Sequence, residues 1–240
     1  MNCRAPGTHG EAQTSLRYSA REATTMRYLN KEAAILEMAH GRKVLHLGCV
    51  GFTDLPDGDR VALAKQTLHH SLTQSADVVG VDYSAAVVRE YDRLGIFKNI
   101  LVGNVETLGD LPLNQTFDLV IAGDIIEHVS NPGLMLDGIK RFCRVDTKVV
   151  ITTPHAFGVP NFIRFLVGRF HDGAEHVATY HMENLHCLLS RHGYVVEEMA
   201  TCHQSAATRL PMFRLGKAVF RRFPKLAGTI FAVARVADGL

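Results

Sequence analysis

The 240-residue chain is long enough for one large domain with a sizeable core. Its composition is ordinary, with 47% hydrophobic and 21% charged residues, and its net charge of +2 argues against a polyanionic partner. No apolar run approaches the roughly 20 residues that cross a bilayer, and residues 1–13 lack the apolar core of a signal peptide. Five scattered cysteines, without a CxxC pair, indicate reduced thiols and a cytoplasmic protein.

We expect residues 1–11 to be disordered, and apolar positions near helical spacing predict a helical cap over residues 12–40. Four helices are predicted beyond the cap, over 59–75, 84–95, 132–144 and 182–193. Seven strands are predicted between and after these helices, over 43–50, 77–84, 99–106, 117–126, 147–155, 194–202 and 229–236.

The first five predicted strands are short and apolar, and most links between them have room for a helix. This alternation predicts an α/β fold with a parallel, doubly wound sheet in a single domain, residues 1–240. In such sheets ligands bind beyond the carboxyl ends of the strands. The residues that directly follow each strand are therefore the candidates for a binding site.

The first strand is followed by "GCVGF", in which Gly48 and Gly51 allow a ligand to approach the backbone closely. The helix after this loop offers free N–H groups to an anion. Asp82 ends the next strand, where a carboxylate can accept both hydroxyls of a ribose. A nicotinamide oxidoreductase shares this device, but its G-x-G-x-x-G pattern is absent because Val50 occupies the third position.

Five segments resemble, in order, the motifs of class I S-adenosylmethionine-dependent methyltransferases: "VLHLGCVGF", "VVGVDYS", "VGNVETL", "FDLVIAGDIIEHVSNPG" and "VVITTPH". The fourth is similar to ubiquinone-type and polysaccharide-cluster O-methyltransferases. The resemblance covers residues 42–155, and "EHVATYHMENLHCLLSRHGYVV" resembles the later substrate-side helix and sixth strand. It implies a Rossmann-like sheet of seven strands, mostly parallel, whose last strand is antiparallel.

The resemblance implies S-adenosyl-L-methionine as the cofactor, which has no phosphate and needs no lysine in the glycine loop. Its carboxylate would meet the backbone of the loop, its ribose Asp82, its adenine Asn104 and Val105, and its methionine the segment from Ala122 to Asp124. The cofactor-binding residues expected on this basis are Gly48, Cys49, Gly51, Asp82, Tyr83, Asn104, Val105, Glu106, Ala122, Gly123 and Asp124.

Some residues depart from the family pattern. His46 stands where the family usually has an acidic residue, Val50 and Phe52 replace glycines, and Asn104 replaces a common aspartate. Because His46 cannot act as a carboxylate towards the ammonium group of the ligand, a weaker cofactor affinity is implied, for which Asp124 could compensate. These departures leave open the alternative of a non-catalytic protein that binds the cofactor.

Methyl transfer to an alcohol requires removal of the hydroxyl proton, for which histidine suits near neutral pH. Three histidines are candidate catalytic residues. His155 follows the fifth strand, and His176 matches a histidine that the family often carries before its substrate-side helix. His128, in "EH", can instead anchor its loop by hydrogen bonds to the backbone. His69, His70, His186 and His192 are expected at the surface or at helix ends.

We predict no metal site. His171, Asp172, Glu175 and His176 are close in sequence, but loops with several polar residues are common. The insertion over residues 156–175 carries four phenylalanines, so it forms either a small satellite core or the wall of an acceptor pocket.

Residues 209–225 alternate basic and apolar side chains and contain no acid. Such a segment either packs on the domain or contacts an anionic bilayer peripherally. The expected partner is a small-molecule or glycan acceptor, and no nucleic acid. The resemblance to polysaccharide-cluster O-methyltransferases implies O-methylation of a hydroxyl on a glycan, glycolipid or small molecule, with a quinone-type phenol as an alternative acceptor.

Overall fold

The computed structural model describes residues 26–51, 62–168, 175–203 and 211–238. Its strands are β1 (Tyr28–Asn30), β2 (Lys43–Leu47), β3 (Asp77–Asp82), β4 (Ile100–Val102), β5 (Phe117–Gly123), β6 (Cys143–Pro154), β7 (Tyr194–His203) and β8 (Thr229–Val236). Its helices are α1 (Lys31–Ala39), α3 (Leu68–Thr73), α4 (Ala85–Arg93), α5 (Pro132–Lys140), α6 (Val159–Leu166), α7 (Met182–Arg191) and α8 (Pro211–Arg222), with 3-10 turns η2 (Val105–Asp110) and η4 (Pro224–Leu226).

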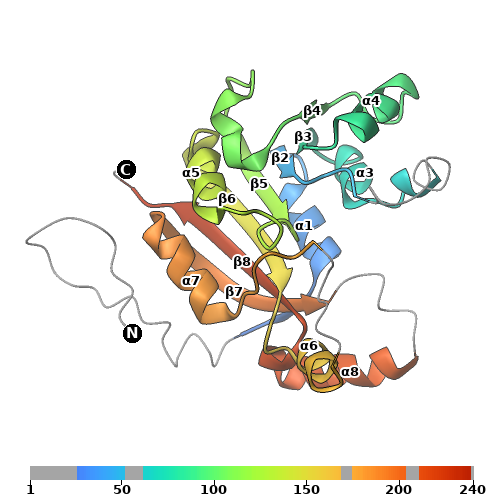
Figure 1. The fold of residues 1–240 in the computed structure, drawn as a ribbon, viewed down its shortest axis with the longest axis vertical. Helices are drawn as coiled ribbons and strands as arrows, with labels where there is room; N and C mark the ends of the chain where they lie inside the picture. The colour runs from blue at the N-terminus through green and yellow to red at the C-terminus, as the bar shows by residue number, and fades with distance from the viewer. Residues whose placement is uncertain (1–25, 52–61, 169–174, 204–210, 239–240) are drawn as a thin grey trace, which may run out of the picture.

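The eight strands form one sheet in the order β1-β7-β8-β6-β5-β2-β3-β4 (Figure 1). β8 runs antiparallel to both β6 and β7, whereas the other neighbouring pairs are parallel. The predicted Rossmann-like sheet with an antiparallel last strand is therefore confirmed. The strand order reverses between β2 and β5, which is where this class of fold binds ligands.

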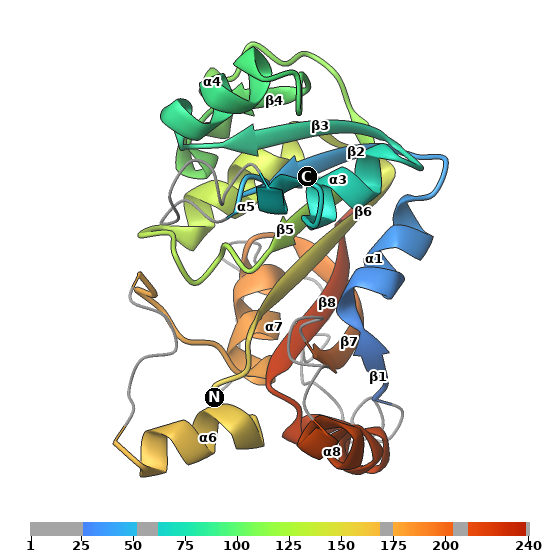
Figure 2. The ribbon, with the colours of Figure 1, turned by 90° about the vertical axis from the view of Figure 1, so that its right-hand side faces the viewer.

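Alternate residues of each central strand point to opposite faces of the sheet. In β2, Leu45 and Leu47 join a core with η2, α5 and α7, whereas Val44 joins a second core with α1 and α3. Helices consequently cover both faces (Figure 1, Figure 2). This double cover explains why the central strands are mostly apolar on both faces.

The prediction of seven strands is wrong because β1 adds an eighth at the edge of the sheet. Residues 28–30 lie within the predicted helical cap, yet they pair in parallel with β7. Tyr28 stacks on His203, with ring centroids 5.3 Å apart, and it also contacts Phe220 of α8. The cap becomes helical only at Lys31, after Asn30 accepts a hydrogen bond from the backbone of Ala33. Residues 12–25 of the predicted cap lie outside the described residues.

The helix predicted over residues 59–75 is interrupted at residues 65–67. Thr67 caps a new helix, α3, because its hydroxyl accepts a hydrogen bond from the backbone of His70. The helices predicted near 84–95, 132–144 and 182–193 are present as α4, α5 and α7.

Cys49, Cys143 and Cys202 are free thiols, as the scattered cysteines predict, whereas Cys187 is disulfide-bonded and departs from that prediction. Among the described residues, no helix combines the length and apolar character that crossing a bilayer demands.

Candidate functional site

The sheet brings the predicted cofactor residues together at the carboxyl ends of its strands. Leu47 at the end of β2 pairs with Val81 on one side and with Ala122 on the other, and Asp82 pairs with Val102. The four strands β2, β3, β4 and β5 therefore end at nearly the same level. The residues that follow them lie side by side although they are up to 77 positions apart in sequence, from Leu47 to Asp124.

Asp82 is the most constrained of these residues. Its carboxylate is only 5% exposed, and its two oxygens accept hydrogen bonds from the backbone N–H groups of Val50 and Ser84, each at 3.0 Å. Asp82 thus fixes the glycine loop against the start of α4. Each carboxylate oxygen can accept a second hydrogen bond, so the carboxylate can still receive two hydroxyl groups. The adjacent Tyr83 is 69% exposed.

The two glycines of the loop adopt conformations that other residues disfavour. Gly48 has φ +66° and Gly51 has φ +57°. A Cβ atom on Gly48 would lie 2.7 Å from Cδ1 of Ile125, whereas a Cβ on Gly51 would meet none of the described residues within 4 Å. Gly51 therefore faces open space at the loop, and Gly48 lets the loop pass closely over the turn that follows β5.

Alanine at these glycines should destabilise the fold to different extents. Gly51→Ala is expected to cost about 1–2 kcal/mol, the penalty of a left-handed conformation. Gly48→Ala should cost more, because the same penalty is joined by the displacement of Ile125. Gly109→Ala, where a Cβ also meets nothing and φ is ordinary, serves as the control. Urea denaturation measures the order, and an equal loss in all three variants would contradict it.

Val50 and Cys49 do not obstruct this edge. Both side chains are buried in a core with Val87, Val88 and Tyr91 of α4. Only the backbone N–H of Val50 faces Asp82. The side chain of the valine that replaces a usual glycine therefore lies in the core rather than at the surface of the loop. Phe52 lies outside the described residues.

The residues after β4 form hydrogen bonds within their own segment and with the start of α5. The amide oxygen of Asn104 accepts from the backbone N–H of Glu106 at 2.9 Å and so caps η2. The carboxylate of Glu106 accepts from the backbone of Asn131, which joins η2 to the start of α5. Val105 is buried in the core. Contacts of these three residues with adenine remain predictions.

Asp124, which directly follows β5, is a second acidic residue at the carboxyl ends of the strands. Ala122 is buried, Gly123 is partly exposed, and Asp124 has φ +50°. One oxygen of Asp124 accepts from the hydroxyl of Thr152 at 2.8 Å, and the other pairs with the ammonium group of Lys31. Sequence reasoning missed Lys31. It reaches Asp124 because β1 extends the sheet and starts α1 beside this edge.

His46 is buried in the core next to a second histidine. It is 3% exposed, and its Nδ1 lies 3.3 Å from Nδ1 of His69, which is fully buried in the first turn of α3. Burial, His69 and Lys31 lower the pKa of His46 well below its ordinary value. Burial lowers the pKa of His69 to about 4. The pair is therefore a neutral part of the core, and His46 does not place a positive charge at the cofactor edge.

This pair should make stability depend on pH. In the unfolded chain His69 regains its ordinary pKa of 6.5, so below that pH the unfolded state binds more protons than the folded state. Stability should therefore fall as the pH drops from 6.5 towards 4, and His69 alone should contribute about 3 kcal/mol to the loss. Urea denaturation of the parent and of His69→Gln at a series of pH values measures this. An identical slope in both proteins would contradict the assignment.

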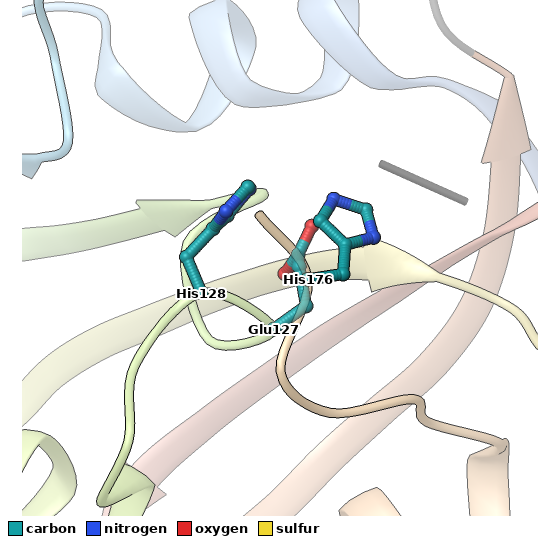
Figure 3. Close-up of side chains that lie close together, drawn as sticks. All are labelled: Glu127, His128 and His176. Carbon is teal, nitrogen blue, oxygen red and sulfur yellow. The ribbon is translucent and has the colours of Figure 1, made fainter. Parts of the chain in front are cut away.

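Glu127, His128 and His176 form a cluster whose side chains come from the turn after β5 and from the segment before α7 (Figure 3). Their ligand-type atoms all lie within 4.8 Å of one another. The rings of His128 and His176 meet edge to face, with centroids 4.5 Å apart. Glu127 is 1% exposed, and burial together with the charge of Asp124 raises its pKa to about 7.

Backbone hydrogen bonds hold this cluster together. The N–H groups of Val177 and Ala178 both donate to the carbonyl oxygen of Glu127, at 2.9 and 3.2 Å. The hydroxyl of Thr153 donates to Oε2 of Glu127 at 2.9 Å. The segment before α7 is thereby fastened to the turn after β5, which sets His176 against His128.

His155 lies at the end of β6, as predicted, but it is not part of this cluster. It is 5% exposed, and its Nδ1 lies 3.2 Å from the carbonyl oxygen of Ala227. Burial lowers its pKa, which keeps the imidazole neutral near pH 7. The structure therefore places His128 and His176 in contact with each other, whereas His155 contacts Ala227, which lies just before β8.

Residues 61–151 match the family model described as a methyltransferase domain. No curated protein sequence matches the chain.

Solved structures resemble the chain in fold. The complex of the Haloferax volcanii Trm112 methyltransferase activator with a methyltransferase aligns with a TM-score of 0.55 and 14% identity, covering 87% of this chain and 88% of that chain. An S-adenosylmethionine-dependent methyltransferase from Mesorhizobium loti aligns with a TM-score of 0.54 and 13% identity, covering 85% and 95%. The N-methyltransferase NodS from Bradyrhizobium japonicum WM9, in complex with S-adenosyl-L-homocysteine, gives 0.52 and 13%, covering 87% and 86%.

Proposed function

We propose that the chain is a class I S-adenosylmethionine-dependent methyltransferase that methylates a hydroxyl oxygen of a glycan, a glycolipid or another small molecule; the match of residues 61–151 to the methyltransferase domain and the shared fold support this proposal. The observation that carries the proposal is the contact between His128 and His176 beside the buried Glu127. A hydroxyl group must lose its proton when it is methylated, and imidazole and carboxylate groups are the side chains that manage such a proton near neutral pH.

The residues present fit the cofactor. Open space at Gly51 and the buried carboxylate of Asp82 suit the carboxylate and the ribose of S-adenosylmethionine, and Lys31 adds a positive charge near Asp124. When bound, the cofactor supplies an electrophilic methyl group on a sulfonium. Lys31 and Asp124 would hold its methionine part, while Asp82 orients its ribose. The remaining work of the protein is to align the acceptor oxygen with the methyl carbon and to remove its proton.

We place the acceptor near the segment over 156–175. Its described part includes α6, whose Phe162 and Phe165 are both about half exposed and stack with centroids 6.4 Å apart. Phe157 contacts the ring of His181 at 5.2 Å and connects this segment to the start of α7. An exposed aromatic wall suits the apolar face of a sugar ring or a phenol.

We further propose a cytoplasmic enzyme in which α8 contacts anionic lipid peripherally. Phe220 of α8 packs against Tyr28 of β1, and the exposed Arg221 and Arg222 follow it. The helix is thus attached to the domain on one side and carries positive charge at its end. A lipid-linked acceptor would be the reason for such a contact.

An acceptor screen tests the proposed hydroxyl specificity. The protein is incubated with methyl-labelled S-adenosylmethionine and separate panels of sugars, glycolipids, phenols and amines. Label is expected in an ether formed on a sugar or glycolipid hydroxyl, and none on the amines. Label on phenols alone would favour the quinone-type acceptor, and label on amines alone would refute O-methylation.

A further inference from the structure

The cluster of Glu127, His128 and His176 contains the donor set of a metal site. It offers two imidazoles and one carboxylate from two chain segments that the fold fastens together. Two imidazoles with one carboxylate are a common set of protein ligands for Zn²⁺, Fe²⁺ and related ions, with further positions left open for water or substrate. We propose that these three residues bind a divalent transition-metal ion, which holds the acceptor hydroxyl of the proposed methyl transfer.

The spacing of the ligand atoms supports the proposal. Two atoms that each lie about 2.1 Å from one ion are at most about 4.2 Å apart. The three ligand atoms here already lie within 4.8 Å of one another. Three atoms bound to one ion in a tetrahedral site are about 3.4 Å from one another, so an ion can be bound after side-chain movements of about 1 Å. His128 is exposed and His176 is partly exposed, so the cluster is open to solvent on one side.

Glu127 carries the second observation, which is independent of the spacing. Its side chain is 1% exposed, and its Oε2 accepts from the hydroxyl of Thr153. Within the described part of the chain, its Oε1 has no hydrogen-bond partner. A buried carboxylate oxygen without a partner is costly. A cation bound at Oε1 would satisfy this atom, while Thr153 fixes the orientation of the carboxylate, as outer partners of metal ligands commonly do.

The charges around the cluster also favour a cation. Asp124 lies close enough to Glu127 to raise its pKa, and Lys31 acts on Glu127 in the opposite direction. Lys31 is itself paired with Asp124, so their charges largely offset each other. The net charge contributed by Glu127, Asp124 and Lys31 is therefore negative when both carboxyl groups are ionised.

The role of the ion rests on the proposed function. A bound divalent ion lowers the pKa of an oxygen ligand and orients it. The acceptor hydroxyl would release its proton to solvent water, its oxygen would form the bond to the methyl carbon, and the carbon–sulfur bond would break to leave a neutral thioether. Because the charge of Asp124 acts on Glu127, this oxygen would lie near the end of the proposed cofactor site that holds the methionine part.

Titration with Co²⁺ tests the site without cofactor or acceptor. The purified protein is stripped with a chelator, and Co²⁺ binding is followed by calorimetry and by visible absorption of the protein-bound ion. We expect one ion per chain. His176→Ala, His128→Ala and Glu127→Gln should each weaken binding at least about 10-fold. His40→Ala, an exposed histidine at the end of α1, should bind like the parent.

The outcomes separate this inference from the proposed function. Absence of Co²⁺ binding, or unchanged binding in all three variants, overturns the metal site and leaves hydroxyl methylation to a histidine pair without metal. Co²⁺ binding that the variants abolish supports the site even if no hydroxyl is methylated. Binding of S-adenosyl-L-homocysteine, measured by calorimetry, shows that each variant is folded. Glu127→Gln removes the charge of the carboxylate but keeps the shape of the side chain.

Discussion

Replacing His176 with alanine is expected to lower turnover by about 10²–10⁴-fold while the affinity for S-adenosylmethionine stays the same. His176 contacts His128 in the cluster at Glu127, and it lies in the segment before α7, outside the glycine loop and the strand ends assigned to the cofactor. As a base or as a metal ligand, it would act on the acceptor hydroxyl. Steady-state rates with an identified acceptor, together with calorimetric titration of the cofactor, measure both quantities.

Two further variants make this result specific. His40→Ala should retain full turnover, because His40 is exposed at the end of α1. His155→Ala removes a group that is 5% exposed and bonded to Ala227, so it should lose less turnover than His176→Ala. A loss in His155→Ala that equals or exceeds the loss in His176→Ala would assign proton removal to His155.

Asp82→Ala is expected to weaken S-adenosylmethionine binding by at least about 100-fold. The substitution removes the acceptor proposed for the ribose hydroxyls, and hydrogen bonds to a charged group contribute about 1.5–3 kcal/mol each. It also releases the backbone N–H groups of Val50 and Ser84, which hold the glycine loop against α4. Calorimetric titration of the parent and variant with the cofactor gives the ratio of the dissociation constants.

Asp92→Ala is the matched control, because Asp92 is an exposed aspartate on α4. Asp82→Asn keeps the shape of the side chain but removes its charge and one of its two acceptor oxygens. Its affinity should fall between those of the parent and of Asp82→Ala. Equal affinity in the parent and in Asp82→Ala would remove Asp82 from the cofactor site.

The central sheet could be predicted because its strands are buried on both faces. Each of β2, β3, β5 and β6 contains a short run of mostly apolar, buried residues, and the strand ends in a parallel sheet converge whatever the intervening sequence. This regularity is why the positions of Gly48, Asp82 and Asp124 at one edge followed from the chain alone. The short strand β1 has three residues and no such run, so the prediction of a helix there failed.

The charged and polar contacts of the site could not be predicted in the same way. Lys31 reaches Asp124 across 93 positions, and His46 meets His69 across 23. Neither pair has a local signal, because each depends on how separate elements pack against the sheet. The sequence did single out His128 and His176, but only folding shows that Glu127 joins them and that His155 does not.

Transfer of a labelled methyl group is the most direct test of the account as a whole. The protein is incubated with methyl-labelled S-adenosylmethionine and a fractionated cell extract, beside a variant that carries both His128→Ala and His176→Ala. We expect label in a product that survives protease and nuclease digestion, with S-adenosyl-L-homocysteine released in equal amount and little transfer by the variant. A protein that binds the cofactor but transfers no more label than the double variant would contradict it.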